Sequence, residues 1–430
     1  MKPKIILISP PCFEIENDAL EQNLGLAYIA SSLKANGFDA IIREYTGLSK
    51  AEFQQSLNNL EFAQIYGVSI MSTSFSNAKR IIASIREQYP HAYIIAGGVH
   101  VSAMPHHVLK NTEADVAIIV EGELTFVQLV NDFVNARPIR GIVKGVSPSN
   151  LDLLPFPDRL CVDQSKYTRK LNGKPVLSVL SSRGCRFACV HCNSTIMGGG
   201  SHGIRFRSIF NIVAEINELR KLGYDSFRFN DDSFTDRPDV DALIQTLGQL
   251  GISFRIFARL NSLNEKRIKL LADCGCELVS IGIESVNPKN LEFLHKGKMP
   301  YNMLSVCKKY HLRTRVSFMV GLPYDTYESI RADFEYAKTL DFDEFAVYSL
   351  IPYPGTRIWE TPEKYGYIIE DRNYENYVQL GHNKCSAAVM SHVSEDGYRF
   401  TSDDVSNWCT LANDILGKSK QHMKYSRTAQ

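Results

Sequence analysis

The sequence predicts an α/β protein made of a doubly wound sheet followed by a partial barrel. Short apolar runs that end in Gly, Pro or Ser recur along the chain, and segments with helical apolar spacing lie between them. Strands buried on both faces appear as continuous apolar runs, and helical connections make such strands parallel. An interval rich in proline separates two series of these runs, which indicates two α/β regions.

The first region covers residues 1–135. Its apolar runs are KIILISPP, DAIIREY, IYGVSIM, AYIIAGG and VAIIVEG, and Leu26 to Leu33 carry the spacing of a helix. This order predicts a flavodoxin- or Rossmann-like sheet, whose ligands bind beyond the carboxyl ends of the strands. The residues expected on this binding rim are Ser69, Ser72, Thr73, Gly97, Gly98, His100, Glu121, Gly122 and Glu123.

Residues 136–176 are interpreted as a linker, because Pro138, Pro148, Pro155 and Pro157 interrupt any periodicity. The second region, residues 177–356, contains the runs LSVLSS, SFRFN, SFRIFA, ELVSIGI, RVSFMVG and EFAVYSL. Six parallel strands with outer helices predict a partial (βα)6 barrel that is open on one side. Residues 357–430 are polar and rich in tyrosine, and we expect a small C-terminal domain with a helix near 403–416.

Composition narrows the class of protein. The 430 residues carry a net charge of +1, and the first 135 hold nine Lys and Arg against fourteen Asp and Glu, which disfavours a nucleic-acid partner. No apolar run approaches the roughly 20 residues of a membrane-spanning helix, and the N-terminal run IILI is too short for a signal peptide. We expect a cytoplasmic monomer without a membrane partner.

The stretch 183-RGCRFACVHC-192 places Cys185, Cys189 and Cys192 directly after the first barrel strand, where barrel enzymes carry their chemistry. In a reducing compartment, clustered cysteines indicate metal or redox chemistry. Unrelated cysteines and a zinc site completed by His191 or His202 are the alternatives. A [4Fe–4S] cluster held by three thiolates leaves one iron open to a ligand, which a catalytic cluster requires.

These cysteines resemble the CxxxCxxC motif of the radical S-adenosylmethionine (SAM) enzymes. Further segments that fit this family are RFRS (205–208), FRFNDDSFT (227–235), ARLNS (258–262), LADCGCELVSIGIES (271–285), Lys296-Gly297, FMVGLP (318–323) and PYPGT (352–356). The first region resembles the cobalamin-binding domain fused ahead of class B radical SAM methyltransferases, through YGVSIMSTSF, AGGVHVSAMP, VEGE and the linker LPFPDR. The resemblance covers roughly residues 3–356.

The resemblance implies that Cys185, Cys189 and Cys192 hold a [4Fe–4S] cluster whose open iron chelates SAM. A flavodoxin or ferredoxin would supply the electron that cleaves SAM to a 5′-deoxyadenosyl radical. His191 stands where the family carries an aromatic residue near the adenine, and a metal-ligand role is the competing interpretation. Further candidate SAM contacts are Asp231, Asp232, Arg259 and Glu284, for which ion pairs between barrel strands are the alternative.

For the first region, the resemblance implies that the rim binds cobalamin. The DxHxxG motif, in which a His replaces the lower ligand of cobalt, is absent from the sequence. Its absence is usual in the resembling class, although a domain that has lost cobalamin would also lack the motif. Gly97 and Gly98 would allow the backbone to approach the corrin closely.

The expected function is therefore that of a cobalamin-dependent radical SAM enzyme that methylates an unactivated carbon of a small metabolite, natural-product intermediate or peptide. The alternatives are cyclisation, oxidation, rearrangement or transfer of another SAM fragment with the same cofactors, and a corrinoid- or redox-sensing module. We expect the substrate at the open side of the barrel, covered by residues 357–430, with Tyr365, Tyr367, Tyr374 and Tyr377 as candidate lid residues.

Overall fold

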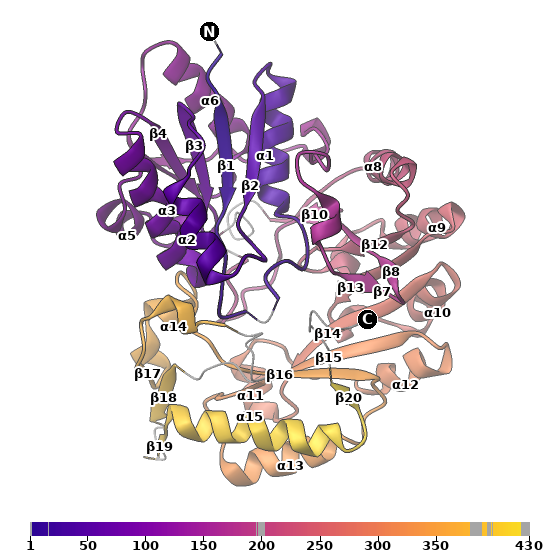
Figure 1. The fold of residues 1–430 in the computed structure, drawn as a ribbon. Helices are drawn as coiled ribbons and strands as arrows, with labels where there is room; N and C mark the ends of the chain where they lie inside the picture. Colours follow the sequence, from indigo (N-terminus) through magenta and orange to yellow (C-terminus); the bar gives the residue numbers. More distant parts are fainter. Residues whose placement is uncertain are drawn as a thin grey trace. The chain divides into compact units, whose positions relative to one another are not determined.

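The computed structural model describes residues 2–15, 17–194, 196, 203–378, 389–393, 397 and 399–422. The chain divides into two compact units (Figure 1). The N-terminal unit comprises Met1–Thr168, Thr195–Ser201 and Asn373–Asn376, and the barrel unit comprises the remainder. His202, named above as a possible zinc ligand, lies outside the described residues.

The N-terminal unit contains a six-stranded parallel sheet with the strand order β2-β1-β3-β4-β5-β6. Its strands are β1 (Ile5–Ser9), β2 (Ala40–Glu44), β3 (Ile65–Ser69), β4 (Tyr93–Gly97), β5 (Val116–Ile119) and β6 (Gly141–Lys144). The first five are the predicted strands. Chain order reverses between β1 and β3, so this sheet has its topological switch point there.

Helices cover both faces of this sheet, as Figure 1 shows. Helices α1 (Leu24–Ala35) and α6 (Glu123–Val134) pack on the face that carries Ile5 and Leu7. The opposite face, with Ile6 and Ile8, packs against α2 (Lys50–Asn58), α3 (Phe75–Gln88), α4 (Val99–Ala103) and α5 (Pro105–Asn111). Alternate residues of β1 thus enter two cores, and each fully buried Ile or Leu contributes roughly 1.5–3 kcal/mol.

Strand β6 corrects the predicted linker, which was placed at residues 136–176. The GIVK segment pairs with β5 and lies within the N-terminal unit, whose continuous part extends to Thr168. Its burial alternates between half-buried and exposed, so it lacks the continuous apolar signal of the inner strands. A short edge strand between Pro138 and Pro148 therefore escapes detection by apolar pattern.

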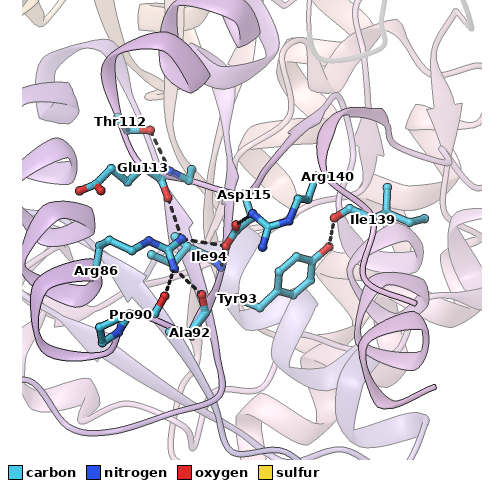
Figure 2. A network of polar contacts seen from close by, with 11 residues as sticks. Arg86, Pro90, Ala92, Tyr93, Ile94, Thr112, Glu113, Asp115, Ile139 and Arg140 are labelled. Atoms are coloured by element: carbon cyan, nitrogen blue, oxygen red, sulfur yellow. Dashed lines mark hydrogen bonds and ion pairs between the residues drawn. The ribbon is translucent and has the colours of Figure 1, made fainter. Parts of the chain in front are cut away.

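A buried polar network anchors this edge (Figure 2). Asp115, directly before β5, accepts hydrogen bonds from Arg86 of α3 and from the Ile94 backbone, each at 2.9 Å, and also pairs with Arg140. Arg86 donates further to the carbonyl groups of residues 90, 92 and 113. The network joins α3, β4, β5 and the start of β6 at the amino-terminal edge of the sheet, opposite the predicted rim.

The barrel unit contains a seven-stranded sheet with the order β20-β16-β15-β14-β13-β12-β9. The strands are β9 (Leu177–Val179), β12 (Ser226–Phe229), β13 (Ser253–Ala258), β14 (Cys276–Glu284), β15 (Arg313–Val320), β16 (Glu344–Ser349) and β20 (Gln421–His422). All neighbouring pairs are parallel, and the first six are the predicted barrel strands. Strands β9 and β20 form the two edges, so the sheet of the described residues is an open barrel.

The helices of this unit follow the strands as predicted. They are α8 (Ile209–Lys221), α9 (Val240–Leu250), α10 (Glu265–Asp273), α11 (Pro288–Phe293), α12 (Asn302–Lys309) and α13 (Tyr327–Ala337). Helix α8 buries Ile212, Ile216 and Leu219 at helical spacing. Within the described part of the chain, no helix is both long enough and apolar enough to cross a bilayer.

The predicted separate C-terminal domain at 357–430 also needs correction. The expected helix is present as α15 (Ser402–Gly417), but it packs on α13 and β16, and β20 extends the barrel sheet. A small antiparallel sheet of β17 (Tyr367–Ile369), β18 (Met390–Val393) and β19 (Arg399–Phe400) lies in the same unit. Helix α15 buries Val405, Trp408 and Leu416, and this apolar face makes the segment part of the barrel unit.

Candidate active site

The cysteine loop begins after β9. The short strands β10 (Ser182–Arg183) and β11 (Arg205–Phe206) pair at its base, and Cys185, Cys189 and Cys192 lie between them as free, half-buried thiols. Burial raises the pKa of both Cys185 and Cys192, and nearby cysteines add to each rise, so the thiols are close enough to interact.

The loop has no closed metal site of its own. Among the described residues, no group of three or more His, Cys, Asp and Glu side chains is arranged to hold a metal ion. A bound cation would lower the pKa of the thiols and so offset the cost of forming three thiolates. Donors already stand beside two sulfur atoms, since Ser194 Oγ lies 2.7 Å from Cys192 Sγ and Arg259 Nη1 lies 3.8 Å from Cys189 Sγ. Because a bound cation would compensate the charge of three thiolates, the loop fits a cationic metal cluster.

Asp231, at the end of β12, fixes the start of this loop. Its carboxylate accepts hydrogen bonds from the Ser181 backbone at 3.1 and 3.2 Å and from the Ser181 and Ser182 hydroxyl groups. The residue is only 2% exposed. These contacts engage the carboxylate within the protein, so Asp231 positions the loop, and its predicted contact with SAM stays a prediction.

Asp232, the next residue, is exposed. Its charge contributes to the raised pKa of Cys185 and Cys192, which places its carboxylate near the thiols. Partial withdrawal from water raises the pKa of Asp232 itself, and the adjacent Asp231 charge adds to the effect. Of the two aspartates, Asp232 is therefore the one available to a ligand.

Arg259 follows β13 and packs against the cysteine loop. Its guanidinium group lies 3.8 Å from the centre of the Phe187 ring, as well as beside Cys189. The Ser262 hydroxyl donates to the Arg259 carbonyl at 2.7 Å and fixes the turn. A planar guanidinium at this point suits a ligand carboxylate, because it offers paired donors.

Glu284 ends β14 in a left-handed backbone conformation, with φ of 68°. The pairing register with β15 shifts between Gly282 and Glu284. Lys296 Nζ donates to Glu284 Oε1 at 3.1 Å and to the Gly282 carbonyl at 2.6 Å. The glutamate thus stands at a kinked strand end in a mostly buried ion pair.

His191 lies in the cysteine loop beside these charges. Burial lowers its pKa to about 4; the Glu284 carboxylate opposes this shift, and Lys296 and Arg259 add to it. The imidazole is therefore neutral near pH 7, and its Nδ1 atom is buried without a hydrogen-bond partner among the described residues. His191, Arg259 and Glu284 come from separate segments and converge, so three of the predicted SAM contacts lie together.

Sequence reasoning missed the residues that support this cluster. Ser181 and Ser182 were not singled out, and Lys296 was recognised only as part of a motif. Asn261 donates its amide to the backbone carbonyls of Lys296 and Lys298, at 3.5 and 3.3 Å. The signal for Asn261 and Lys296 lay in the segments ARLNS and HKGK, but spacing alone does not reveal that these segments meet.

The rim of the N-terminal unit has a polar group at the switch point. Asn23, which caps α1, donates its amide to Ser69 Oγ at 3.2 Å and to Ser9 Oγ at 3.4 Å. Gly98 has φ of 107°, and a Cβ there would lie 2.7 Å from the Ile70 carbonyl oxygen, whereas a Cβ at Gly97 would meet nothing within 4 Å. Gly98 is required by the fold, and Gly97 borders open space. Ser9 and Asn23 were missed.

Ser72 is engaged by His100, since its hydroxyl lies 3.0 Å from His100 Nδ1. Burial lowers the pKa of His100 to about 4, and the nearby His107 adds to the shift. The Tyr374 ring packs 5.0 Å from the His100 ring, and the Tyr374 hydroxyl lies 3.4 Å from Met104 Sδ. Thr73 stays half-buried, with its carbonyl accepting from the Cys12 thiol.

Only Tyr374 of the four candidate lid tyrosines belongs to the N-terminal unit. Tyr367 and Tyr377 are buried in the barrel unit, where their hydroxyl groups donate to the carbonyls of Gly321 and Asp371. Tyr365 packs on Phe293. These contacts are structural packing within the units.

The segment at residues 121–123 is less open than predicted. Glu121 and Glu123 are 6% and 5% exposed, and both have interaction partners. The backbone at Gly145 lies close to Glu121, because a Cβ at Gly145 would lie 1.9 Å from the Glu121 carbonyl oxygen. Gly122 is the N-cap residue of α6, and a Cβ there would lie 3.4 Å from Ile29. Ser69, Thr73 and Gly97 are therefore the more accessible rim residues, and cobalamin contacts of the rim stay a prediction.

Comparison with known proteins agrees with this division. The B12 binding domain family matches residues 17–130, and the Radical SAM superfamily matches residues 179–337. An uncharacterized methyltransferase of Pyrococcus horikoshii is 30% identical over 387 residues, covering 83% of this chain and 82% of that protein. The anaerobic magnesium-protoporphyrin IX monomethyl ester cyclase of Rubrivivax gelatinosus is 23% identical, covering 82% of this chain and 68% of that protein.

A solved structure shares the fold. The radical SAM methyltransferase TsrM of Kitasatospora setae, determined with cobalamin and a [4Fe–4S] cluster bound, superposes with a TM-score of 0.65 at 17% identity. The match covers 85% of this chain and 79% of that one. With both family matches and the Pyrococcus relative, the chain belongs to the radical SAM superfamily of enzymes, in the group that carries an N-terminal B12-binding domain.

Proposed function

We propose that this enzyme is a cobalamin-dependent radical SAM methyltransferase that acts on an unactivated carbon of a small metabolite, natural-product intermediate or peptide. The observation that carries the proposal is the convergence of Arg259, Glu284, His191 and Asp232 on a loop with three free thiols. When bound, a [4Fe–4S] cluster would supply the electron that cleaves SAM, and cobalamin would carry the methyl group.

In this proposal, each residue of the barrel site has a distinct role. Cys185, Cys189 and Cys192 hold the cluster as thiolates. Arg259 binds the carboxylate of SAM through its paired N–H groups, and Glu284 accepts from the SAM ammonium or a ribose hydroxyl. Asp232 is the second acceptor.

His191 would place a neutral flat ring beside the adenine. Burial keeps the imidazole uncharged, so it adds no repulsion to a sulfonium cation. The orphan Nδ1 atom is available to a ligand hydrogen bond. This role accords with the family position of His191 better than iron ligation does.

The N-terminal rim is proposed to bind cobalamin around Ser69, Thr73 and Gly97. The absence of a side chain at Gly97, with open space around it, fits the close approach of a large planar ligand. Asn23 and Ser9 would add hydrogen bonds at the switch point. We further propose a monomer that receives electrons from a flavodoxin or ferredoxin.

The test is anaerobic purification with cluster reconstitution, followed by measurement of iron, sulfide and cobalt and by assay of SAM products. The proposal predicts the four irons and four sulfides of a [4Fe–4S] cluster, bound cobalamin, and formation of both 5′-deoxyadenosine and S-adenosylhomocysteine when substrate is present. Formation of 5′-deoxyadenosine with the true substrate but never S-adenosylhomocysteine would refute methyl transfer.

Radical chemistry without methylation is the second candidate. It is favoured by the similarity to the Rubrivivax cyclase. The same cofactor residues would serve both reactions, so the product decides between them. A mass gain of one CH₂ supports methyl transfer, and a change in hydrogen count alone supports cyclisation or oxidation.

A further inference from the structure

We propose that Lys296 is a positioning residue that holds the Glu284 carboxylate toward a ligand ammonium or hydroxyl. The inference rests on the proposed function, since it concerns the same SAM site, and it adds a residue that acts only through Glu284. It is derived from the contacts, backbone conformation and burial at the end of β14.

Lys296 fixes both the side chain and the preceding backbone of Glu284. Its ammonium group donates to Glu284 Oε1 at 3.1 Å and to the Gly282 carbonyl at 2.6 Å. The two side chains are 6% and 12% exposed. Removing one partner of such a buried pair leaves an uncompensated charge, so the pair behaves as a unit.

The backbone at Glu284 needs this support. A residue other than glycine is disfavoured in the left-handed region, where Glu284 has φ of 68°. A Cβ at Gly282 would lie 2.2 Å from Glu284 Oε1 and 3.2 Å from Lys296 Nζ. Gly282 therefore leaves the space in which the carboxylate meets the ammonium, and the hydrogen bonds hold a conformation that the backbone alone disfavours.

The pair leaves one carboxylate oxygen for a ligand. Glu284 Oε1 is used by Lys296, while Oε2 makes no hydrogen bond within the part of the chain that the structure describes. The His191 ring lies near enough to Glu284, Lys296 and Arg259 for all three charges to act on it. With Oε1 held by Lys296, the carboxylate can accept from a ligand ammonium or hydroxyl through Oε2.

Lys296 is also tied to the segment that carries Arg259. Asn261, in the turn η6 (Leu260–Ser262), donates to the carbonyls of Lys296 and Lys298. The Arg259 turn and the Lys296 segment are thereby joined by one amide. This link lets the carboxylate-binding and ammonium-binding groups keep a fixed spacing.

The test is a double-mutant cycle on the full-length reconstituted enzyme. Binding of radiolabelled SAM is measured by equilibrium dialysis for the wild type, Lys296→Met, Glu284→Gln and the double variant. We expect Lys296→Met to weaken SAM binding roughly 10–100-fold, as loss of a supporting partner commonly does. The double variant should bind no more weakly than Glu284→Gln alone, because the lysine acts through the glutamate.

Lys420→Met is the matched control, since Lys420 Nζ likewise donates to a backbone carbonyl, that of Leu340 at 2.7 Å. It should leave SAM affinity unchanged. If Lys296→Met lowers the thermal midpoint but retains wild-type affinity, the lysine has only a structural role and the proposal fails. If Lys296→Met does not fold, the double variant, which lacks the unpaired charge, is compared with Glu284→Gln instead. Weaker SAM binding by the double variant than by Glu284→Gln would then contradict the proposal. If the wild type itself binds no SAM, the proposed function fails instead.

Discussion

The carboxyl ends of the two sheets differ in how far their polar groups are already engaged by the protein itself. In the barrel unit, Arg259 and Glu284 come from two separate strand ends and lie near Cys189 and His191 of the cysteine loop, and Glu284 keeps an oxygen without a partner in the described structure. In the N-terminal unit, most predicted rim groups are already engaged by the protein, as Ser72 is by His100.

The difference corresponds to two kinds of ligand binding. A site that binds a small charged molecule needs side chains with spare hydrogen-bonding capacity, such as Glu284. A site for a broad planar cofactor needs an open surface and close backbone approach, which Gly97 offers. The polar rim groups of the N-terminal unit then serve to hold the shape of that surface. Three experiments test this contrast.

The largest expected effect concerns His100, whose ring contacts the Ser72 hydroxyl at the N-terminal rim. Its pKa is lowered to about 4 in the folded protein, against an ordinary value of 6.5. Above pH 6.5 neither state binds the extra proton, and as the pH falls from 6.5 toward 4 only the unfolded state takes it up. Stability is therefore lost in that window, by up to about 3 kcal/mol.

The measurement is the free energy of unfolding in urea at pH 7, 5.5 and 4.5. His100→Phe should flatten the pH dependence, while His106→Phe, which replaces an exposed histidine, should leave it as in the wild type. If His100→Phe loses as much stability as the wild type between pH 7 and 4.5, the buried neutral imidazole is not the cause of the pH dependence.

The second effect concerns Asp231, which holds the cysteine loop. Asp231→Asn removes the charge and an acceptor for Ser181 and Ser182, so the loop is less well ordered. We expect iron retention after reconstitution and SAM affinity to fall together, by roughly 10–100-fold. Asp225→Asn, at the amino end of the same strand, is the control. Normal iron content with weakened SAM binding would instead indicate that Asp231 contacts SAM directly.

The smallest effect separates the two rim glycines. Gly98→Ala forces a Cβ into 2.7 Å contact with the Ile70 carbonyl at a positive φ, and should cost about 1–3 kcal/mol of stability. Gly97→Ala meets no protein atom within 4 Å and should leave stability unchanged. Cobalamin titration by absorbance should then show weaker binding for Gly97→Ala, and retained affinity in that variant would remove Gly97 from the proposed corrin surface.

The strands were largely predictable, because parallel strands buried on both faces carry continuous apolar runs. All five runs of the first series and all six of the second form strands. The edge strand β6 was not predictable in this way, since half of its residues face solvent. Its place in the sheet follows from tertiary contacts such as the pairing of Arg140 with Asp115 (Figure 2).

Those residues of the candidate site that lie at the end of a strand were predictable. Arg259, Glu284 and Asp232 each follow or end a barrel strand, and such residues meet at one rim. The support beneath them was not predictable. Lys296 lies twelve residues after Glu284 and across a helix, and Asp231 binds serines fifty residues away. Sequence alone does not show which polar residue faces the ligand and which faces the protein.

The measurement that tests the central claim most directly is SAM cleavage by reconstituted Cys189→Ala, compared with wild type and with Cys274→Ala, a half-buried thiol outside the loop. All three proteins are reduced anaerobically, and 5′-deoxyadenosine is quantified. The account predicts cleavage by wild type and Cys274→Ala and none by Cys189→Ala, with a matching loss of iron. A Cys189→Ala protein that still formed 5′-deoxyadenosine would contradict it.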